Sequence, residues 1–489
     1  MDPSHARPHR TLLRGATVVS VDPAIGNFDR ADILISDDLI AEIDSRIDVG
    51  PDVEVVDVDG MIALPGFVDT HRHTWQSVMR HGYAELDPLR YFDDMLRGIG
   101  AAYEPEDVRV GNLLGAVSAL SAGTTTLLDW SHIQNSAEHS DAAVTGLREA
   151  GIRAVFGHGW PLLDDGRWTE NSTLTHPADI ERLQKEHFSD PGGLVTLAMA
   201  ARGPEMAAPG VWQADLALAR DLGIRTSVHA GAYAHNEPVH AVAQYGEAGL
   251  LADDLTFVHC CRSSDAELEM IAETGATVSI GVHCELNSQG IGDIPLDRML
   301  AAGVRPSLSG DTETKCSGDM FTQMRMLFGH HRSWMGGGHS SVAADQAQLL
   351  LHDVLAFATI EGARAIGQGD RIGSLTPGKQ ADIILVRATD LNVAPVLDPV
   401  ASAVLAAHEG NVDSVLVGGR FVKRAGAMLG CDPSTLVNSA AASQRRILGR
   451  RAARLHSHGR DTPPNRTYSP YEFPPSRVTA SRITREQEQ

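Results

Sequence analysis

The middle of the chain alternates between short apolar segments and longer stretches with helical periodicity. The helical stretches cover residues 106–122, 215–222, 265–274 and 345–366. Alternation of this kind predicts parallel strands, because a helix connects each strand to the next. The apolar segments that we predict to be strands are 62–69, 124–129, 154–157, 194–200, 226–229, 256–259, 278–283 and 307–311.

These strands indicate an α/β fold, specifically a (β/α)8 TIM barrel, which takes about 250 residues or more. The chain has 489 residues, which is enough for such a barrel and a smaller module. An open, doubly wound sheet is the structural alternative. It is disfavoured because no glycine-rich dinucleotide-binding loop follows the first strand.

Both ends of the chain carry short apolar runs that are separated by Asp, Gly and Pro. Residues 11–57 have the pattern of a small antiparallel sheet, and similar runs return at 381–386 and 412–417. We therefore expect the two ends to build one small β-sandwich together. The predicted domains are 1–63 and 369–437 for the two parts of the sandwich, 64–368 for the barrel and 438–489 for a tail.

The tail is rich in arginine and proline, with arginine pairs at 445–446 and 450–451. A basic segment can attract nucleic acid, but we interpret this one as a strap along an acidic body. The whole chain has a formal net charge of −22. Because phosphate binding requires a basic surface, this charge argues against nucleic acid as the main partner.

The composition is that of an ordinary globular protein, with 43% hydrophobic residues. No segment approaches the roughly 18 consecutive apolar residues that a membrane span needs, and the N-terminus has no apolar signal region. We therefore expect a cytoplasmic protein without a membrane partner. The 5 cysteines form neither a paired framework nor a CxxC zinc pattern, so we expect reduced thiols.

Five polar side chains stand at the C-terminal ends of predicted strands: His71, His73, His229, His259 and Asp311. A barrel brings these ends to one rim, and residues two apart on a strand share a face. A single such histidine would more often be structural, but five polar residues at one rim predict a metal site. Imidazole and carboxylate ligands suit zinc and also accept iron, manganese or cobalt.

Several motifs in a fixed order carry a resemblance to a known family. They are PGFVDTHRH at 65–73, AGTTT at 122–126, VH at 228–229, VHC at 258–260, SGD at 309–311, DMF at 319–321 and GSLTPGKQAD at 373–382. The chain resembles the amidohydrolase superfamily, in the branch that contains cytosine, guanine and S-adenosylhomocysteine deaminases and triazine hydrolases. The resemblance covers most of the chain and also implies a homodimer or homotetramer.

By this resemblance, His71, His73, His229 and Asp311 would bind one divalent metal ion, and His259 would lie beside the attacking water or the substrate. Asp311 would also take the proton from that water. We expect zinc, with iron or manganese as alternatives. No lysine stands at the end of the fourth strand, so a bridged pair of metals is not expected.

One position departs from the pattern that the resemblance implies. Deaminases of this branch usually carry a glutamate three residues after the histidine of the fifth strand, but here that residue is Ala232. We expect Glu285 to carry protons in its place. It is an even number of residues from Gly281, near the end of the seventh strand, so the two would lie on the same face of the strand. Glu237, in the loop after the fifth strand, is the alternative.

Further polar and aromatic residues near the rim are predicted to bind a flat heterocyclic substrate by stacking and hydrogen bonding. Arg202 could instead bind a carboxylate or phosphate of the substrate. The predicted substrate-binding residues are Trp75, Gln76, His132, His158, Trp160, Arg202 and His283.

Together these features predict a metal-dependent hydrolase that acts on a C–N bond of a small molecule, by hydrolytic deamination of an N-heterocycle. One alternative keeps the site but opens a cyclic amide or displaces another leaving group from a ring. Others are nonhydrolytic metal chemistry, such as isomerisation or decarboxylation of a specialised metabolite, and a barrel without catalysis. The substrate itself is not encoded in the fold, because loops select it.

Overall fold

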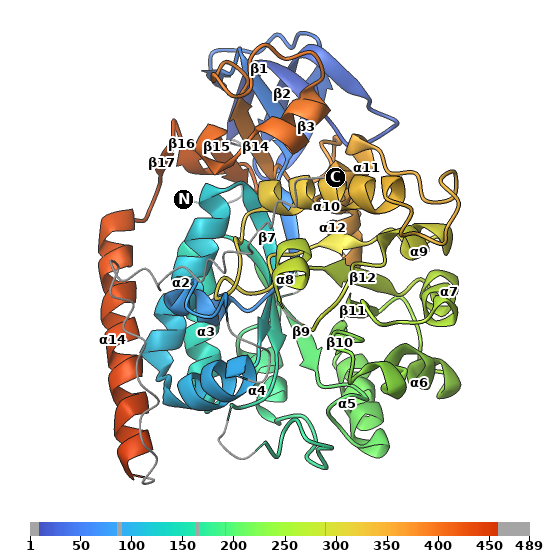
Figure 1. Ribbon diagram of the computed structural model, residues 1–489. Helices are drawn as coiled ribbons and strands as arrows, with labels where there is room; N and C mark the ends of the chain where they lie inside the picture. Colours follow the sequence, from blue (N-terminus) through green and yellow to red (C-terminus); the bar gives the residue numbers. More distant parts are fainter. Residues whose placement is uncertain (1–8, 86–89, 163–165, 191, 289, 458–489) are drawn as a thin grey trace, which may run out of the picture.

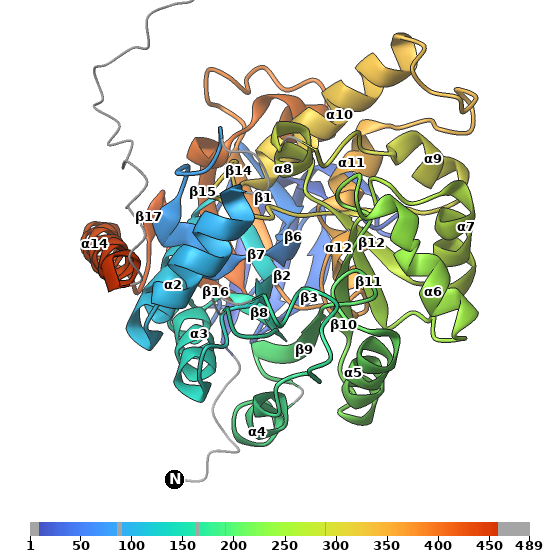
Figure 2. The same ribbon diagram turned by 60° about the horizontal axis from the view of Figure 1, so that its bottom comes forward.

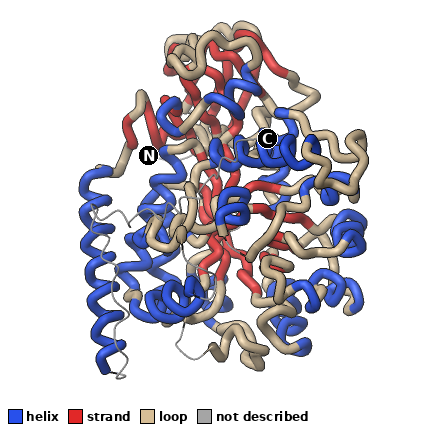
Figure 3. The backbone as a smooth tube through the Cα atoms, in the orientation of Figure 1, coloured by secondary structure: helices blue, strands red, loops and turns tan. Residues whose placement is uncertain are grey.

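In the computed structural model, the middle of the chain forms a nearly closed barrel of eight parallel strands, which lies beneath a second sheet in Figures 1 and 3. The structure describes residues 9–85, 90–162, 166–190, 192–288 and 290–457. The barrel strands follow one another in chain order. They are β6 (Phe67–Arg72), β7 (Thr124–Ser131), β8 (Arg153–His158), β9 (Val195–Ala201), β10 (Thr226–Ala230), β11 (Leu255–His259), β12 (Thr277–Ile280) and β13 (Ser307–Leu308).

Side chains inside the barrel connect its last strand to its first. The Thr70 hydroxyl on β6 lies 2.9 Å from the hydroxyl of Ser307 on β13 and donates to the Leu308 carbonyl at 3.0 Å. Just beyond β13, Asp311 forms a parallel bridge with Arg72. The predicted (β/α)8 barrel is therefore confirmed.

The predicted strand limits differ from those in the structure, with the largest consequences at 62–69 and 278–283. The segment predicted at 62–69 divides at Gly66 into β5 (Met61–Pro65) of the second sheet and β6 of the barrel. A Cβ atom at Gly66 would lie 2.0 Å from the Thr125 hydroxyl, so only glycine allows this close crossing between the sheets. The strand predicted at 278–283 ends at Ile280, and His283 lies instead on the short helix α8 (Val282–Asn287).

The second sheet has nine strands and is built from both ends of the chain, as predicted. Its central connection is the antiparallel pairing of β5 with β14. The expectation of a purely antiparallel N-terminal part is wrong, because β1 pairs in parallel with β4 and β5. The remaining strands are β1 (Arg10–Val19), β2 (Asn27–Ser36), β3 (Leu39–Asp44), β4 (Glu54–Asp57), β14 (Ile383–Arg387), β15 (Val412–Val417), β16 (Arg420–Arg424) and β17 (Ala427–Met428).

Helices surround the barrel, as Figure 2 shows. They are α2 (Pro105–Ser121), α3 (Ala137–Ala150), α4 (Asp179–Glu186), α5 (Pro209–Asp221), α6 (Ala241–Glu247), α7 (Asp265–Thr274), α9 (Leu296–Ala301), α10 (Met320–Gly336), α11 (Leu351–Phe357), α12 (Ile360–Ala365), α13 (Pro399–Ala401) and α14 (Pro433–Ser457). Shorter 3-10 or π segments are η2 (Thr74–Met79), η3 (Tyr91–Ile99), η4 (Gly100–Ala102), η5 (Glu237–Val239), η6 (Ser402–Ala406) and η7 (Glu409–Asn411).

The predicted helix at 265–274 coincides with α7, whose start is determined by local side chains. The Ser264 hydroxyl accepts a hydrogen bond from the Glu267 backbone N–H, and the Glu267 carboxylate accepts one from the Ser264 N–H. This reciprocal cap satisfies backbone donors that the helix cannot pair internally. By contrast, the helix predicted at 345–366 is two short helices, α11 and α12.

The C-terminal helix α14 packs along α2, and Figure 1 shows the two side by side. Buried Asp107 on α2 accepts hydrogen bonds from Ser443 at 2.6 Å and Arg446 at 2.9 Å, and it also pairs with Arg450. Residues 438–457 of the predicted tail thus belong to α14 and lie along α2, whereas 458–489 lie outside the described residues. None of the helices within the described ranges is both long and apolar enough to cross a membrane.

Candidate metal centre

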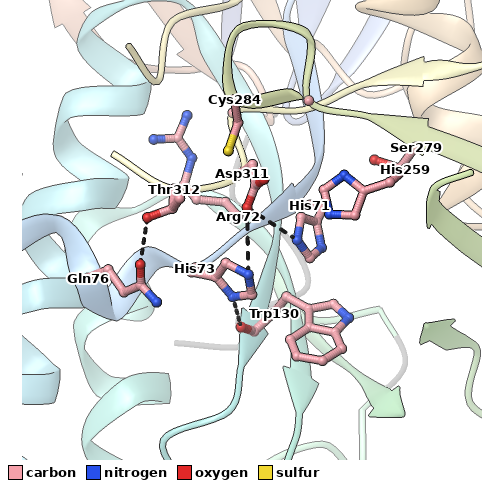
Figure 4. Close-up of polar contacts among 12 residues, drawn as sticks. His71, Arg72, His73, Gln76, Trp130, His259, Ser279, Cys284, Asp311 and Thr312 are labelled. Atoms are coloured by element: carbon pink, nitrogen blue, oxygen red, sulfur yellow. Dashed lines mark hydrogen bonds and ion pairs between the residues drawn. The ribbon is translucent and has the colours of Figure 1, made fainter. Parts of the chain in front are cut away.

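The ends of three barrel strands bring the predicted ligands together. His71 and His73 come from β6 and the residue just after it, His229 from β10, and Asp311 from the segment after β13. Figure 4 shows His71, His73 and Asp311 of this set. Ligand atoms of the three histidines lie within 4.8 Å of one another. The Oδ1 atom of Asp311 lies 3.6 Å from the Nε2 atoms of His71 and His73.

The ring nitrogens of these histidines are left available for a metal ion. Both nitrogens of His71 and the Nδ1 of His229 are buried without a hydrogen-bond partner among the described residues. The Nδ1–H of His73 donates to the Trp130 carbonyl at 3.0 Å, which leaves Nε2 free to bind an ion. Buried polar atoms without partners are costly. The donor set therefore fits a divalent ion that imidazole and carboxylate ligands hold.

The surroundings keep the ligands in the protonation states that metal binding requires. Burial, reinforced by the neighbouring His71, lowers the pKa of His73 to about 3 and that of His229 well below its usual value. Burial alone would raise the pKa of Asp311, but the contact with His71 and the charges of His259 and His73 lower it well below the usual range. Neutral imidazoles and an ionised carboxylate are the forms that coordinate metals.

Two residues of the site have strained backbone conformations. His259 and Asp311 have φ angles of 79° and 50°, in the left-handed region that residues other than glycine rarely adopt. Backbone hydrogen bonds hold Asp311 in place, because its N–H donates to the His71 carbonyl at 2.9 Å and its carbonyl accepts from the His73 N–H at 2.8 Å. Such strain persists where the surrounding structure fixes a functional geometry.

His259 stands beside the ligands and contacts Glu285, which the sequence had suggested as a proton carrier. Glu285 lies in the first turn of α8, not on a strand, and is only 1% exposed. Its Oε1 accepts hydrogen bonds from His259 Nδ1–H at 3.0 Å and from the Gly281 N–H at 2.9 Å. Placing Glu285 on the same strand face as Gly281 was therefore wrong, because residue 285 belongs to a helix. Its hydrogen bond from His259 instead suits it to orient that imidazole ring.

Burial alone would lower the pKa of His259, but the hydrogen bond to Glu285 and the charge of Asp311 outweigh it, so the pKa is raised. His259 is thus suited to carry positive charge, unlike the neutral His73 and His229 nearby. This difference matches separate roles, with His259 near the reacting atoms and the other two as ligands.

A cavity of about 800 Å³ opens directly over these residues, with His73, His229, His259 and Asp311 in its wall. Of the predicted substrate-binding residues, His132 and Trp160 also line it. The other lining residues include many aromatic side chains, namely Tyr91, Phe92, Trp130, Trp168 and Tyr233. A largely apolar cavity with a few polar groups is typical of a small-molecule site.

The five other predicted substrate-binding residues do not line this cavity. Trp75 is buried against Tyr103 and His132, and Gln76 accepts hydrogen bonds from Tyr91 and Thr312. The remaining three form hydrogen bonds with other parts of the protein. His158 bonds to His176, and His283 accepts from the Ser317 N–H. Arg202 donates to Asp215 and Ser172. The suggested anion-binding role of Arg202 is wrong, because Asp215 lies 2.6 Å away and neutralises its charge.

Sequence reasoning missed Glu205 and Lys315, which are among the charged residues that line the cavity. Both lie in loops that follow barrel strands, Glu205 after β9 and Lys315 after β13. Their position just after a strand end was the signal that could have identified them. Ala232 also lines the cavity, whereas Glu237 is exposed and does not.

Comparison with known proteins supports the assignment of the barrel fold and identifies its family. The model of the amidohydrolase family matches residues 62–422. A 5-methylthioadenosine/S-adenosylhomocysteine deaminase of Moorella thermoacetica is 28% identical over 433 residues, which cover 85% of this chain and 95% of the relative. A 5'-deoxyadenosine deaminase of Methanothermobacter thermautotrophicus is 26% identical and covers 87% of this chain and 96% of its own length.

Solved structures share the fold across nearly the whole chain. A zinc-bound adenosine deaminase from Xanthomonas campestris superimposes with a TM-score of 0.78 at 24% identity, covering 91% of this chain and 99% of its own. A zinc complex of atrazine chlorohydrolase from Arthrobacter aurescens gives a TM-score of 0.80 at 21% identity, covering 89% and 100%. With the family model spanning the whole barrel and part of the second sheet, this chain belongs to the amidohydrolase family.

Proposed function

We propose that this protein is a zinc-dependent hydrolase that deaminates an N-heterocycle, replacing a ring C–NH2 group by C=O and releasing ammonia. The observation that carries the proposal is the convergence of His71, His73, His229 and Asp311 at one end of the barrel. The relatives named as deaminases of adenosine-like compounds support the choice of reaction. The two zinc-bound structures of the same fold support the choice of metal.

In this proposal the three histidines and Asp311 hold the ion, which supplies a Lewis acid and lowers the pKa of a water molecule toward neutrality. Asp311 accepts a proton as that water attacks the ring carbon. His259, oriented by Glu285 at 3.0 Å, polarises the group under attack. Trp130, Trp160 and Tyr91 exclude bulk water and offer flat surfaces on which a heterocycle can stack.

The experiment compares the wild-type protein with Asp311→Asn for zinc content and for ammonia release from a panel of aminopurines, aminopyrimidines and aminotriazines. We expect about one zinc per chain in the wild type, and ammonia only from the wild type. Halide or alcohol release without ammonia would favour displacement of another leaving group, which is the reaction named for the atrazine chlorohydrolase of the same fold. A wild-type protein that binds no metal would refute the proposal.

We also propose that the protein is a cytoplasmic homodimer or homotetramer. Leu391 and Leu397, in the loop that follows β14, are fully exposed at 102% and 100%, and a subunit contact would remove these apolar side chains from water. Sedimentation equilibrium of the wild type and of Leu391→Ser tests this proposal. A monomeric wild-type protein would contradict it.

A further inference from the structure

The cavity wall includes a carboxylate, that of Glu205, which the metal centre does not use. Its Oε1 accepts a hydrogen bond from the backbone N–H of Gly231 at 2.6 Å. Gly231 lies two residues after the ligand His229 and directly before Ala232, whose methyl group also faces the cavity. The Glu205 carboxylate therefore reaches the segment of β10 that carries a metal ligand, although it comes from a different strand end.

Glu205 has the properties of a group that can give and take protons. Within the described residues no cation lies within ion-pair distance of it, so its charge is not neutralised. Burial raises the pKa of this carboxyl to about 7, although the Gly231 hydrogen bond and the charge of His259 oppose the shift. The titratable groups that act on it are His259 on β11 and Glu267 on α7. A carboxylic acid with such a pKa is matched to proton transfer at neutral pH.

We propose that Glu205 is a catalytic proton carrier that protonates the ring nitrogen next to the attacked carbon, an inference that rests on the proposed deamination. As water attacks the ring carbon, its proton goes to Asp311 while protonated Glu205 donates to the adjacent ring nitrogen. In the second step the new hydroxyl returns a proton to Glu205, and the amine takes the proton from Asp311. The C–N bond breaks, ammonia leaves, and both carboxyl groups regain their starting states.

The other candidate carboxylates are less suited to this work. Glu285 lies behind His259 and does not line the cavity, and it accepts hydrogen bonds from His259 and from the Gly281 N–H. Glu237 is exposed on η5, outside the cavity wall. The geometry thus selects Glu205 over the two residues that the sequence suggested.

The test measures kcat, KM, zinc content and pH profile for Glu205→Gln, with Glu237→Gln as the matched control. We expect zinc content and KM to stay near wild type in Glu205→Gln while kcat falls by about 100-fold or more. The loss of wild-type activity above about pH 7, where the acid form is depleted, should disappear in this variant. A double variant that adds Ala232→Glu should regain activity, because residue 232 faces the same cavity.

The outcomes separate this inference from the proposed function. A wild-type protein that releases no ammonia from any compound overturns the deamination proposal and the Glu205 role with it. An active wild type with Glu205→Gln within threefold of its kcat overturns the Glu205 role alone. The Glu205 role is also overturned if kcat falls equally in Glu205→Gln and in the control Glu237→Gln.

A second, independent observation concerns Lys315, which lines the cavity and is only 4% exposed. Its ammonium lies 4.5 Å from the centre of the Tyr91 ring. Among the described residues no carboxylate lies within ion-pair distance of this ammonium, and the ammonium donates no hydrogen bond; only the Lys315 backbone carbonyl accepts a side-chain hydrogen bond, from Asn287. A contact with an aromatic ring offsets only part of the cost of removing a charge from water. The remaining cost favours a ligand that brings an anion.

We infer that Lys315 binds a carboxylate or phosphate group of the substrate, at the part of the cavity next to Tyr91. This inference names the substrate class of the proposed function, an N-heterocycle with an anionic substituent. It replaces the role that the sequence had suggested for Arg202, whose charge Asp215 neutralises. A lysine acts here as a point charge and accepts either anion.

Calorimetry on the zinc-loaded protein tests this inference without turnover, so its failure is distinct from failure of the deamination proposal. The probes are 9-ethylhypoxanthine against hypoxanthine-9-acetate, and inosine against inosine 5'-monophosphate, which carry no amino group for the protein to remove. We expect at least one anionic probe to bind about tenfold or more tighter than its neutral counterpart, and Lys315→Met to remove this preference. Lys185→Met, on the exposed surface of α4, is the control.

The pair with the larger preference tells carboxylate from phosphate. Equal binding within both pairs, or a preference that survives in Lys315→Met, would overturn the inference. Lys315→Arg should retain most of the preference, which separates loss of charge from loss of packing.

Discussion

The contact between Glu285 and His259 allows a quantitative prediction for Glu285→Gln. The side chain keeps its size, so the buried site that is 1% exposed stays filled. The amide oxygen can still accept hydrogen bonds from His259, at 3.0 Å, and from Gly281, at 2.9 Å. The substitution therefore removes the negative charge and leaves the hydrogen-bond geometry in place.

The size of the effect follows from the difference between a charged and a neutral hydrogen bond. A hydrogen bond to a charged group contributes roughly 1.5–3 kcal/mol and a neutral one roughly 0.5–1.5 kcal/mol, so about 1–1.5 kcal/mol is lost. Because about 1.4 kcal/mol changes a rate tenfold, kcat should fall about tenfold if His259 gains positive charge in the transition state. KM should change little, because the effect is confined to the reacting centre.

The assay is steady-state ammonia release with parallel measurements of zinc content and melting temperature. Glu273→Gln, exposed near the end of α7, is the matched control and should behave as wild type. A fall of less than twofold in Glu285→Gln would refute the role of this contact. A fall of more than about 100-fold, with zinc intact, would mean that Glu285 itself transfers a proton, as the sequence first suggested.

Other predictions concern the metal and two buried ion pairs. Removal of the metal with a chelator should abolish ammonia release, and one equivalent of zinc should restore it; activity that survives in metal-free protein would contradict the metal-dependent mechanism. Asp107→Ala should lower the unfolding free energy by about 2 kcal/mol, measured in urea, because Ser443 and Arg446 lose their acceptor. An unchanged urea concentration at the midpoint of unfolding would show that these contacts of α14 do not stabilise the protein. Arg202→Met should cost about 3–5 kcal/mol because buried Asp215 is left unpaired, and a second change, Asp215→Leu, should recover much of this loss. Equal stability of the single and double variants would contradict this reasoning.

The cluster of candidate metal ligands was largely predictable because strand periodicity places these residues. His71 on β6 and His73 just after it point to the same side, and the barrel brings His229 and Asp311 to the same rim. The same periodicity failed for Glu285, because the strand before it ends at Ile280 and the chain turns into α8. Side chains alternate between two faces only within a strand, so the spacing from Gly281 could not predict the direction of a residue on the helix that follows.

The cavity was harder to predict because loops build most of it. Glu205 and Lys315 lie in segments without a repeating pattern, so nothing in their spacing showed which way they point. Arg202 looked available at a strand end, but its partner Asp215 comes from α5, and that pairing depends on tertiary packing. The sequence pattern was thus enough to identify the polar residues at the barrel rim. The residues that line the cavity could be identified only from the three-dimensional structure.

The central claim is that His71, His73, His229 and Asp311 together bind one ion, and X-ray absorption spectroscopy of the zinc-loaded protein tests it most directly. We predict a shell of nitrogen and oxygen ligands at about 2.0–2.2 Å without sulfur, and loss of one oxygen ligand in Asp311→Ala. A sulfur ligand at about 2.3 Å would instead mean that a cysteine holds the metal, and would contradict the account.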